Sequence, residues 1–418
     1  MLNWIGTPAH NRWLEAELDR NLEFGRRARV PNGFGWISGD GGLRVEMGTQ
    51  LWITARMVHT YAAATALGRP GSRTLVRHGV DRLVDGPLHD TVHGGWYAAV
   101  PNEGPGVQDR TKSAYAHAFV ALGAASAVAA EVPGADRLLE MAVDTLERYF
   151  WSEREQMYLD DRDETFTHAE DYRGGNANMH AVEAFLILHD VTRRDVWLRR
   201  ALQIATVMVH EVARRNAYRV NEHFDAHWRP LPDYHRSTPA DRFRAFGSTP
   251  GHWVEWARLL LQLRAALLAE GRTAPDWLTE DAEGLFAAAI RDAWSVDGEP
   301  GFVYTVDWSG RPVIRARIRW VVVEAIGAAY ALYQVTGKET YVHRYQEFWD
   351  FCRDHFIDRA SGSWWQELDE HNAVSNVVWN GKQDIYHLLH CLVVPRLPLA
   401  PGLVPALAAG RLDRIQRP

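Results

Sequence analysis

The chain has 418 residues, 46% of them hydrophobic and 24% charged, a composition typical of a soluble globular protein with a sizeable core. The 46 Lys and Arg against 53 Asp and Glu give a formal charge of -7 with no dense basic stripe, so we expect no nucleic-acid partner. With two cysteines, no signal-peptide pattern and no uncharged apolar stretch of about 18 residues, the sequence predicts a cytoplasmic protein with no membrane partner.

Apolar residues recur with the 3.6-residue period of helices along most of the chain. The predicted helices lie near residues 9–28, 46–68, 71–85, 112–131, 135–150, 176–193, 195–214, 250–270, 275–294, 318–336, 338–356 and 383–391. They form two alternating series, each recurring about every 60 to 80 residues. This repeat predicts six helical hairpins that close into an all-α (α/α)6 barrel, a single catalytic domain over residues 1–418.

The two series of predicted helices differ in their polar faces. The series that begins near residue 46 is small and apolar on several faces, as in AYAHAFVALGAASAVAA, which is typical of buried helices. The series that begins near residue 9 has a clearer polar face, as in ADRLLEMAVDTLERYF. We therefore expect the first series to form the inner ring and the second the outer ring. Whether the outer ring packs against a second copy, in a homo-oligomer, stays open.

Aromatic and β-branched residues with turn signals separate outer helices from the inner helices that follow them. These segments are GGWYAAV, QMYLDD, YRVNEHFD, GFVYTVDWSGRPV and GSWWQELD, and they predict short β-hairpins. In such a barrel the hairpins gather on the rim to which the inner helices present their N-termini. That rim is the predicted mouth of a pocket.

Polar side chains that are unusual on buried helices cluster in the first two turns of the predicted inner helices. They are Trp52 with Arg56, Tyr115, Asn176 with His180, His252 with Glu255, Trp320 with Glu324, and Gln383 with His387. Spacings of three or four residues place both members of a pair on one helix face. A single histidine is more often a core or surface residue than a catalyst. A constellation at matching heights, however, predicts a functional pocket.

Three histidines in one pocket suit proton transfer. Moving a proton between adjacent carbons of an open-chain sugar needs a base near neutrality, and the ordinary imidazole pKa is about 6.5. His252, oriented by Glu255, is suited to opening the sugar ring, and Arg56 to stabilising an enediolate. Tyr115, Asn176 and Gln383 are suited to holding hydroxyls. The residues thus predict an aldose–ketose isomerase acting on a monosaccharide.

Three alternative functions fit these residues less well. A metal enzyme lacks support because there is no HExxH motif and HLLH at 387–390 has only Asp384 as a nearby carboxylate, so we predict no metal and no cofactor. A glycoside hydrolase would use two carboxylates among Glu255, Glu324, Glu367 and Asp384, but would leave three histidines without a role. A non-catalytic sugar-binding barrel would need only aromatic and hydrogen-bonding groups, and the 18 tryptophans suit sugar stacking or a large core equally.

Long strings of the sequence carry a resemblance to a known family. They are HNRWLEAELDR, PNGFGW, EMGTQLWITARM, EDYRGGNANMHAVEAFL, YRVNEHFD, FRAFGSTPGHWVEW, SWWQELD and WNGKQDIYHLLHC. Over roughly residues 4–409 the chain resembles the N-acylglucosamine 2-epimerase superfamily and, within it, the branch of bacterial mannose isomerases and sulfoquinovose isomerases. The resemblance implies an (α/α)6 barrel and cofactor-free interconversion of an aldose and its ketose through a cis-enediol. No glycine-rich phosphate cradle is present for the nucleotide that animal epimerases bind.

The resemblance also implies roles for individual residues. It makes His252 and His387 the general acid/base pair. It places around the sugar Trp52, Arg56, Tyr115, Asn176, His180, Arg242, Glu255, Trp320, Gln366 and Gln383. Our hypothesis is that His387 moves the proton between C2 and C1, while His252, supported by Glu255, opens the ring. We predict mannose–fructose exchange, with lyxose–xylulose as a side activity. Sulfoquinovose isomerisation and then sugar 2-epimerisation are the alternatives.

Overall fold

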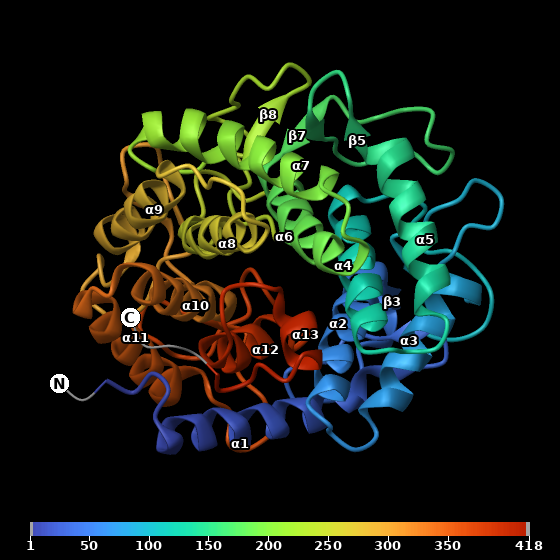
Figure 1. Cartoon of the computed structure of the whole chain (residues 1–418), viewed down its shortest axis with the longest axis horizontal. Helices are drawn as coiled ribbons and strands as arrows, with labels where there is room; N and C mark the ends of the chain where they lie inside the picture. The colour runs from blue at the N-terminus through green and yellow to red at the C-terminus, as the bar shows by residue number, and fades with distance from the viewer. Residues whose placement is uncertain (1–2, 415–418) are drawn as a thin grey trace.

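The computed structural model describes residues 3–414 and arranges their helices in two concentric rings (Figure 1). The inner ring consists of α2 (Leu51–Ala66), α4 (Ala114–Ala129), α6 (Gly175–Thr192), α8 (Pro250–Ala269), α10 (Arg319–Thr336) and α12 (Tyr386–Val393). The outer ring consists of α1 (Pro8–Gly25), α3 (Ser72–Asp85), α5 (Ala135–Thr145), α7 (Val196–Ala205), α9 (Trp277–Ala293) and α11 (Glu339–Phe351). The predicted (α/α)6 barrel is confirmed, with the two series in the predicted layers.

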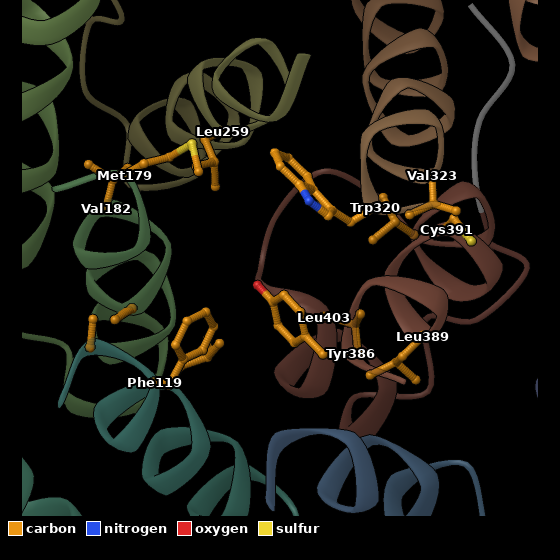
Figure 2. Close-up of a cluster of buried hydrophobic side chains, with 14 of the residues drawn as sticks. Phe119, Met179, Val182, Leu259, Trp320, Val323, Tyr386, Leu389, Cys391 and Leu403 are labelled. Carbon is orange, nitrogen blue, oxygen red and sulfur yellow. The ribbon is translucent and has the colours of Figure 1, made fainter. Parts of the chain in front are cut away.

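The inner helices are buried on nearly all sides. In α10 every residue from Arg319 to Tyr333 is buried, and Figure 2 shows Phe119, Trp320 and Tyr386 pointing from three inner helices toward the middle of the ring. Small residues let these helices approach closely. A Cβ atom on Gly123 of α4 would lie only 2.7 Å from the carbonyl oxygen of Ala55 in α2. The small, apolar composition of this series is therefore what its packing requires.

Short antiparallel strand pairs decorate one rim of the barrel. Local hairpins join β1 (Arg29–Val30) to β2 (Gly33–Phe34), β5 (Trp151–Ser152) to β6 (Met157–Tyr158), and β9 (Thr305–Val306) to β10 (Pro312–Ile314). Distant pairs join β3 (Thr49–Gln50) to β4 (Ala99–Val100), β7 (Tyr172–Gly174) to β8 (His223–Asp225), and β11 (Arg317–Ile318) to β12 (Glu367–Leu368). Short hairpins are thus confirmed, but the segments GGWYAAV, YRVNEHFD and GSWWQELD pair instead with the strand that leads into an inner helix. These distant pairs anchor the N-termini of α2, α6 and α10 to the rim.

The opposite end of the barrel is closed by a helix that the periodicity did not predict. This helix, α13 (Leu403–Ala408), packs against α2, α4 and α6 and lies near the middle of the ring in Figure 1. The sixth inner helix also begins later than predicted, at Tyr386 rather than near residue 383. Within residues 3–414, no helix combines the length and the hydropathy that a membrane span requires.

Candidate active site

A pocket of about 650 Å³, measured to its open mouth, lies where the inner helices begin. All of the predicted site residues line it: Trp52, Arg56, Tyr115, Asn176, His180, Arg242, His252, Glu255, Trp320, Gln366, Gln383 and His387. Residues without a predicted place in the site complete the wall: Glu222, His223, Phe243, Ala245, Thr249, Tyr304, Arg319, Trp379 and Asp384.

His252 stands in the first turn of α8 and is held by a carboxylate from the rim. Its Nδ1 lies 2.8 Å from Glu222 Oε2, while Glu222 Oε1 accepts a hydrogen bond from the backbone N–H of Thr249. Glu222 precedes β8, which pairs with β7 at the start of α6. A carboxylate at Nδ1 favours the tautomer that carries its proton there, which leaves Nε2 with a free lone pair. The expectation that Glu255 orients His252 is therefore wrong, because Glu222 does so.

His387 repeats this arrangement on α12. Its Nδ1 lies 2.8 Å from Glu324 Oε1, and Glu324 comes from the second turn of α10. Burial, reinforced by the nearby Arg56 cation, holds the pKa of His387 well below its usual range. His387 is thus a neutral imidazole whose Nε2 is free to accept a proton.

Trp320 connects the two histidines. Its ring centroid lies 5.1 Å from that of His252 and 5.7 Å from that of His387. It comes from the first turn of α10, the helix that packs between α8 and α12. Two histidine–glutamate pairs therefore lie next to one tryptophan, a side chain on which a sugar ring packs well.

Glu255 lies deeper, among buried charges below His180. Its Oε1 lies 3.9 Å from His180 Nδ1 and 3.4 Å from Arg258 Nη2, and its Oε2 has no hydrogen-bond partner in the protein. Burial and the neighbouring Glu324 raise the pKa of Glu255 well above its usual range. Burial lowers the pKa of His180 to about 4. The structure therefore places a carboxyl group whose burial favours the protonated form beside a neutral imidazole.

Arg56 is the cation at the floor of the pocket. It donates to Asp384 Oδ2 at 3.1 Å and to the Tyr115 hydroxyl at 2.6 Å, and its guanidinium lies 4.2 Å from the centre of the Phe119 ring. Although burial opposes ionisation of Asp384, the surrounding cations, Arg56 foremost, hold its pKa below the usual value. These contacts fix the orientation of the Arg56 guanidinium, which keeps its positive charge.

Several polar atoms at the pocket have no hydrogen-bond partner within the part of the chain that the structure describes. They are Asn176 Oδ1, Gln366 Oε1, Arg56 Nε and Trp379 Nε1. Buried polar groups are normally hydrogen-bonded, so these atoms suit a ligand rich in hydroxyls. Gln383 does not share a helix face with His387, because it precedes α12 and donates to the Asn380 carbonyl. Arg242 lies on the rim loop, where it donates to the Val378 carbonyl.

Comparisons with known proteins agree with this arrangement. The family model described as N-acylglucosamine 2-epimerase (GlcNAc 2-epimerase) matches residues 33–391. The chain belongs to the N-acylglucosamine 2-epimerase family. It is 47% identical over 406 residues to a D-mannose isomerase of Pseudomonas cannabina pv. alisalensis, covering 97% of each chain. It is 45% identical to a D-mannose isomerase of Thermobifida fusca, covering 98% of this chain and 99% of the relative.

A solved structure supports the same family assignment. A crystal structure of D-mannose isomerase superposes with a TM-score of 0.84 at 29% identity, over 92% of this chain and 98% of the other. The relatives at 45–47% identity are isomerases, and they span nearly the whole length of this family member.

Two of the groups that have the donor atoms of a metal site lie at the base of this pocket. They are His180 with Glu183 and Glu255, and Glu255 with Glu324 and His387, each with ligand atoms within 4.8 Å of one another. Arg258 donates to Glu324 and forms ion pairs with Glu183 and Glu255. Its guanidinium supplies the positive charge that these carboxylates would otherwise share with a metal ion.

The most important residue that sequence reasoning missed is Glu222. It stands inside YRVNEHFD, a segment that predicted a hairpin, so its charge did not stand out as one on a buried helix does. The sequence does contain one sign of its role. Glu222 is a carboxylate within a segment that must be buried to pair with β7. Glu324 stands out on its predicted helix, but its contact with His387 could not be predicted from the sequence. That contact requires knowing that α10 and α12 are neighbours.

Proposed function

We propose that this chain is an aldose–ketose isomerase that interconverts D-mannose and D-fructose through a cis-enediol, and that its residues form one catalytic domain. The observation that carries the proposal is the pair of histidine–glutamate dyads, His252 with Glu222 and His387 with Glu324, on either side of Trp320 in one pocket. The D-mannose isomerases at 45–47% identity support mannose as the substrate. D-lyxose, which becomes D-xylulose, is the proposed side substrate.

His387 is the proposed base for the carbon-bound proton. Its lone pair on Nε2 takes the proton from C2 of the open-chain aldose and returns the proton to C1 of the enediol. An imidazole whose pKa lies below its usual range is neutral at physiological pH and ready to accept. Glu324 stabilises the imidazolium that forms, because its Oε1 accepts the Nδ1 proton.

His252 is the proposed catalyst at the oxygens. Its neutral Nε2 first takes the proton of the anomeric hydroxyl and delivers it to the ring oxygen as the bond between C1 and the ring oxygen breaks and the C1 carbonyl forms. After His387 has removed the C2 proton, His252 moves the proton of O2 to O1, so that the return of the carbon-bound proton to C1 leaves the ketose carbonyl at C2. Arg56 faces the charge that develops on these oxygens, and a fixed guanidinium stabilises it by charge-assisted hydrogen bonds. Asn176, Gln366 and the protonated Glu255 are proposed to hold sugar hydroxyls through the atoms that the protein leaves unpaired.

The direct test is to incubate the enzyme with D-mannose in D2O and follow the products by NMR. We expect fructose with deuterium at C1. The variant His387→Asn is expected to lose exchange at carbon, whereas His252→Asn retains it when fructose is supplied at high concentration, because a small fraction of fructose is open-chain in solution. Equal loss of exchange in both variants would contradict the division of roles. Cleavage of mannooligosaccharides without conversion of mannose would instead support a glycosidase.

The choice of sugar is tested by comparing kcat/KM for mannose, lyxose and sulfoquinovose. A sulfonate at C6 needs a cation. Two of the arginines at the pocket are already engaged, Arg56 by Asp384 and Arg319 by the carbonyl oxygens of Trp364 and Asp384. We therefore expect the order mannose, lyxose, sulfoquinovose, and a preference for sulfoquinovose would overturn the proposed substrate.

A further inference from the structure

Arg258 lies behind the pocket. It is on α8, 2% exposed, and it lines a second cavity near α13 together with His59, Glu183 and His390. It does not line the pocket that holds His252 and His387. Any effect of Arg258 on catalysis is therefore transmitted through other residues.

Charged groups surround Arg258 from three inner helices. Its Nε donates to Glu324 Oε2 at 3.0 Å, and its Nη2 lies 3.4 Å from both Glu183 Oε1 and Glu255 Oε1. Its Nη1 also donates to Gln262 Oε1 at 3.0 Å. Three buried carboxyl groups thus share one guanidinium, and such a group is strongly destabilised without its counter-ion. Tyr386 of α12 also faces Arg258, and its hydroxyl donates to Glu183 Oε2.

The contact with Glu324 ties Arg258 to the proposed base. One oxygen of Glu324 accepts from Arg258 and the other accepts from His387 Nδ1. The other titratable or charged groups that face His387 are Arg56, Arg319, His180 and Asp384. Of the groups around His387, Glu324 is the one that touches Nδ1, so its protonation state decides which imidazole nitrogen carries the proton.

We propose that Arg258 is a positioning residue that keeps Glu324 ionised, and that it thereby holds His387 in the tautomer with the proton on Nδ1 and the lone pair on Nε2. One carboxyl oxygen of Glu255 lies within 4.8 Å of one of Glu324, so the two negative charges would repel each other. Because Arg258 donates to Glu324, a proton taken up by this pair resides on Glu255, whose pKa is raised by burial and by Glu324. Without Arg258, a proton on Glu324 is donated to His387 Nδ1, and Nε2 becomes an N–H that cannot accept a proton from carbon.

The test is 15N NMR of histidine-labelled protein, which distinguishes a protonated from an unprotonated ring nitrogen. The His387 signal is identified by its loss in His387→Asn. We expect Nδ1 to be protonated in the wild type and Nε2 in Arg258→Met. Arg264→Met is the matched control, since Arg264 lies on the same helix and makes no ion pair among residues 3–414. A folded Arg258→Met protein that keeps the wild-type tautomer would overturn the proposal.

Turnover supplies a second readout that a merely structural role would not move. In Arg258→Met we expect the acidic limb of the kcat profile to move to higher pH by about two units, so that kcat measured on that limb falls about 100-fold while KM stays within about threefold. The shift is upward because Glu324 must first lose its proton. A lower kcat with the acidic limb of the profile at the same pH as in the wild type would contradict the proposal. Arg258→Lys keeps the charge and is expected to restore most of kcat.

A charge-balanced variant keeps the proposal testable if Arg258→Met does not fold. Arg258→Gln with Glu183→Gln removes one charge of each sign, and Glu183→Gln alone is its control. We expect the double variant to show the Nε2-protonated tautomer of His387 and the control to keep the wild-type tautomer. The inference rests on the proposed function only for the role of His387. If the wild type does not convert mannose, the proposed function fails while the tautomer measurement still decides the inference.

Discussion

Two histidines three residues apart on α12 belong to opposite ends of the barrel. His387 reaches the pocket at the mouth, where Glu324 holds its Nδ1. His390 lies at the rear cavity, where its Nε2 lies 3.2 Å from Nε2 of His59, a residue of α2 whose Nδ1 contacts the Ser126 hydroxyl at 2.7 Å. One histidine is thus presented to a ligand by a carboxylate, and the other is hydrogen-bonded to a second histidine.

The difference shows what distinguishes the proposed base from another buried histidine. Burial leaves both imidazoles neutral, because it lowers the pKa of His390 to about 3 and that of His387 well below its usual range. Burial alone therefore does not create a base. The mouth adds a carboxylate behind the ring and open space in front of it. At the rear, no carboxylate among residues 3–414 hydrogen-bonds to His390, and the Glu183 oxygen lies 3.6 Å from its Nδ1. The following substitutions test this contrast.

Replacing His387 has the largest expected effect on turnover. His387→Asn removes the base and should lower kcat for mannose about 1,000-fold, within the range of general-base catalysis. His390→Asn is the matched control from the same helix, and its kcat should stay within about threefold of the wild type. Steady-state kinetics of both variants, with circular dichroism to verify folding, make the measurement. Comparable losses in the two variants would mean that the contrast between mouth and rear is wrong.

Replacing the carboxylate behind the base has the next largest effect. Glu324→Gln keeps the shape but loses the charge that stabilises the imidazolium, so kcat should fall about 100-fold. Glu222→Gln, which makes the equivalent change behind His252, should also lower kcat, while solvent exchange at the carbon of open-chain sugar should survive. The measurement is kcat together with deuterium exchange followed by NMR. Loss of exchange in Glu222→Gln would show that the two dyads are not specialised.

Replacing Arg56 has the smallest of these expected effects on turnover. Arg56→Lys keeps a cation but loses the fork that contacts Asp384 and Tyr115 together, so the charge facing the enediolate is less well placed. We expect kcat/KM to fall about tenfold, mainly through kcat. Arg319→Lys is a useful comparison, because Arg319 lines the same pocket but donates to backbone carbonyls. A larger loss from Arg319→Lys would assign the stabilising role to that residue.

The same contrast explains what sequence reasoning could and could not reach. Periodicity predicted the two rings because the inner helices are apolar on all faces, and each helix shows this property in its own sequence. It did not give α13, whose LVPALA run is too short for two helical turns of periodic signal. In HLLH the two histidines look equivalent, since only the packing of α2 and α10 against α12 decides which ring meets Glu324 and which meets His59. Glu222 was missed for the same reason, as its partner comes from a different segment of the chain.

The rear pair of histidines should govern acid stability rather than turnover. Burial lowers the pKa of His59 to about 4 and that of His390 to about 3. Both groups are neutral in the folded protein, so their contribution is complete above the unfolded pKa of about 6.5 and is lost as pH falls from there toward 4. Each such group steepens the fall in unfolding free energy by about 1.4 kcal/mol per pH unit.

Replacing both rear histidines with glutamine removes this pH dependence. The double variant His59→Gln/His390→Gln should lose less unfolding free energy than the wild type between pH 6 and pH 5, by about 3 kcal/mol for the two groups. Urea unfolding at several pH values measures the slopes, and the turnover of mannose at pH 7 should stay within about threefold of the wild type. Parallel slopes would show that the two rings are already protonated in the folded state, in which case the negative charge of Glu183, 3.6 Å from His390 Nδ1, outweighs burial.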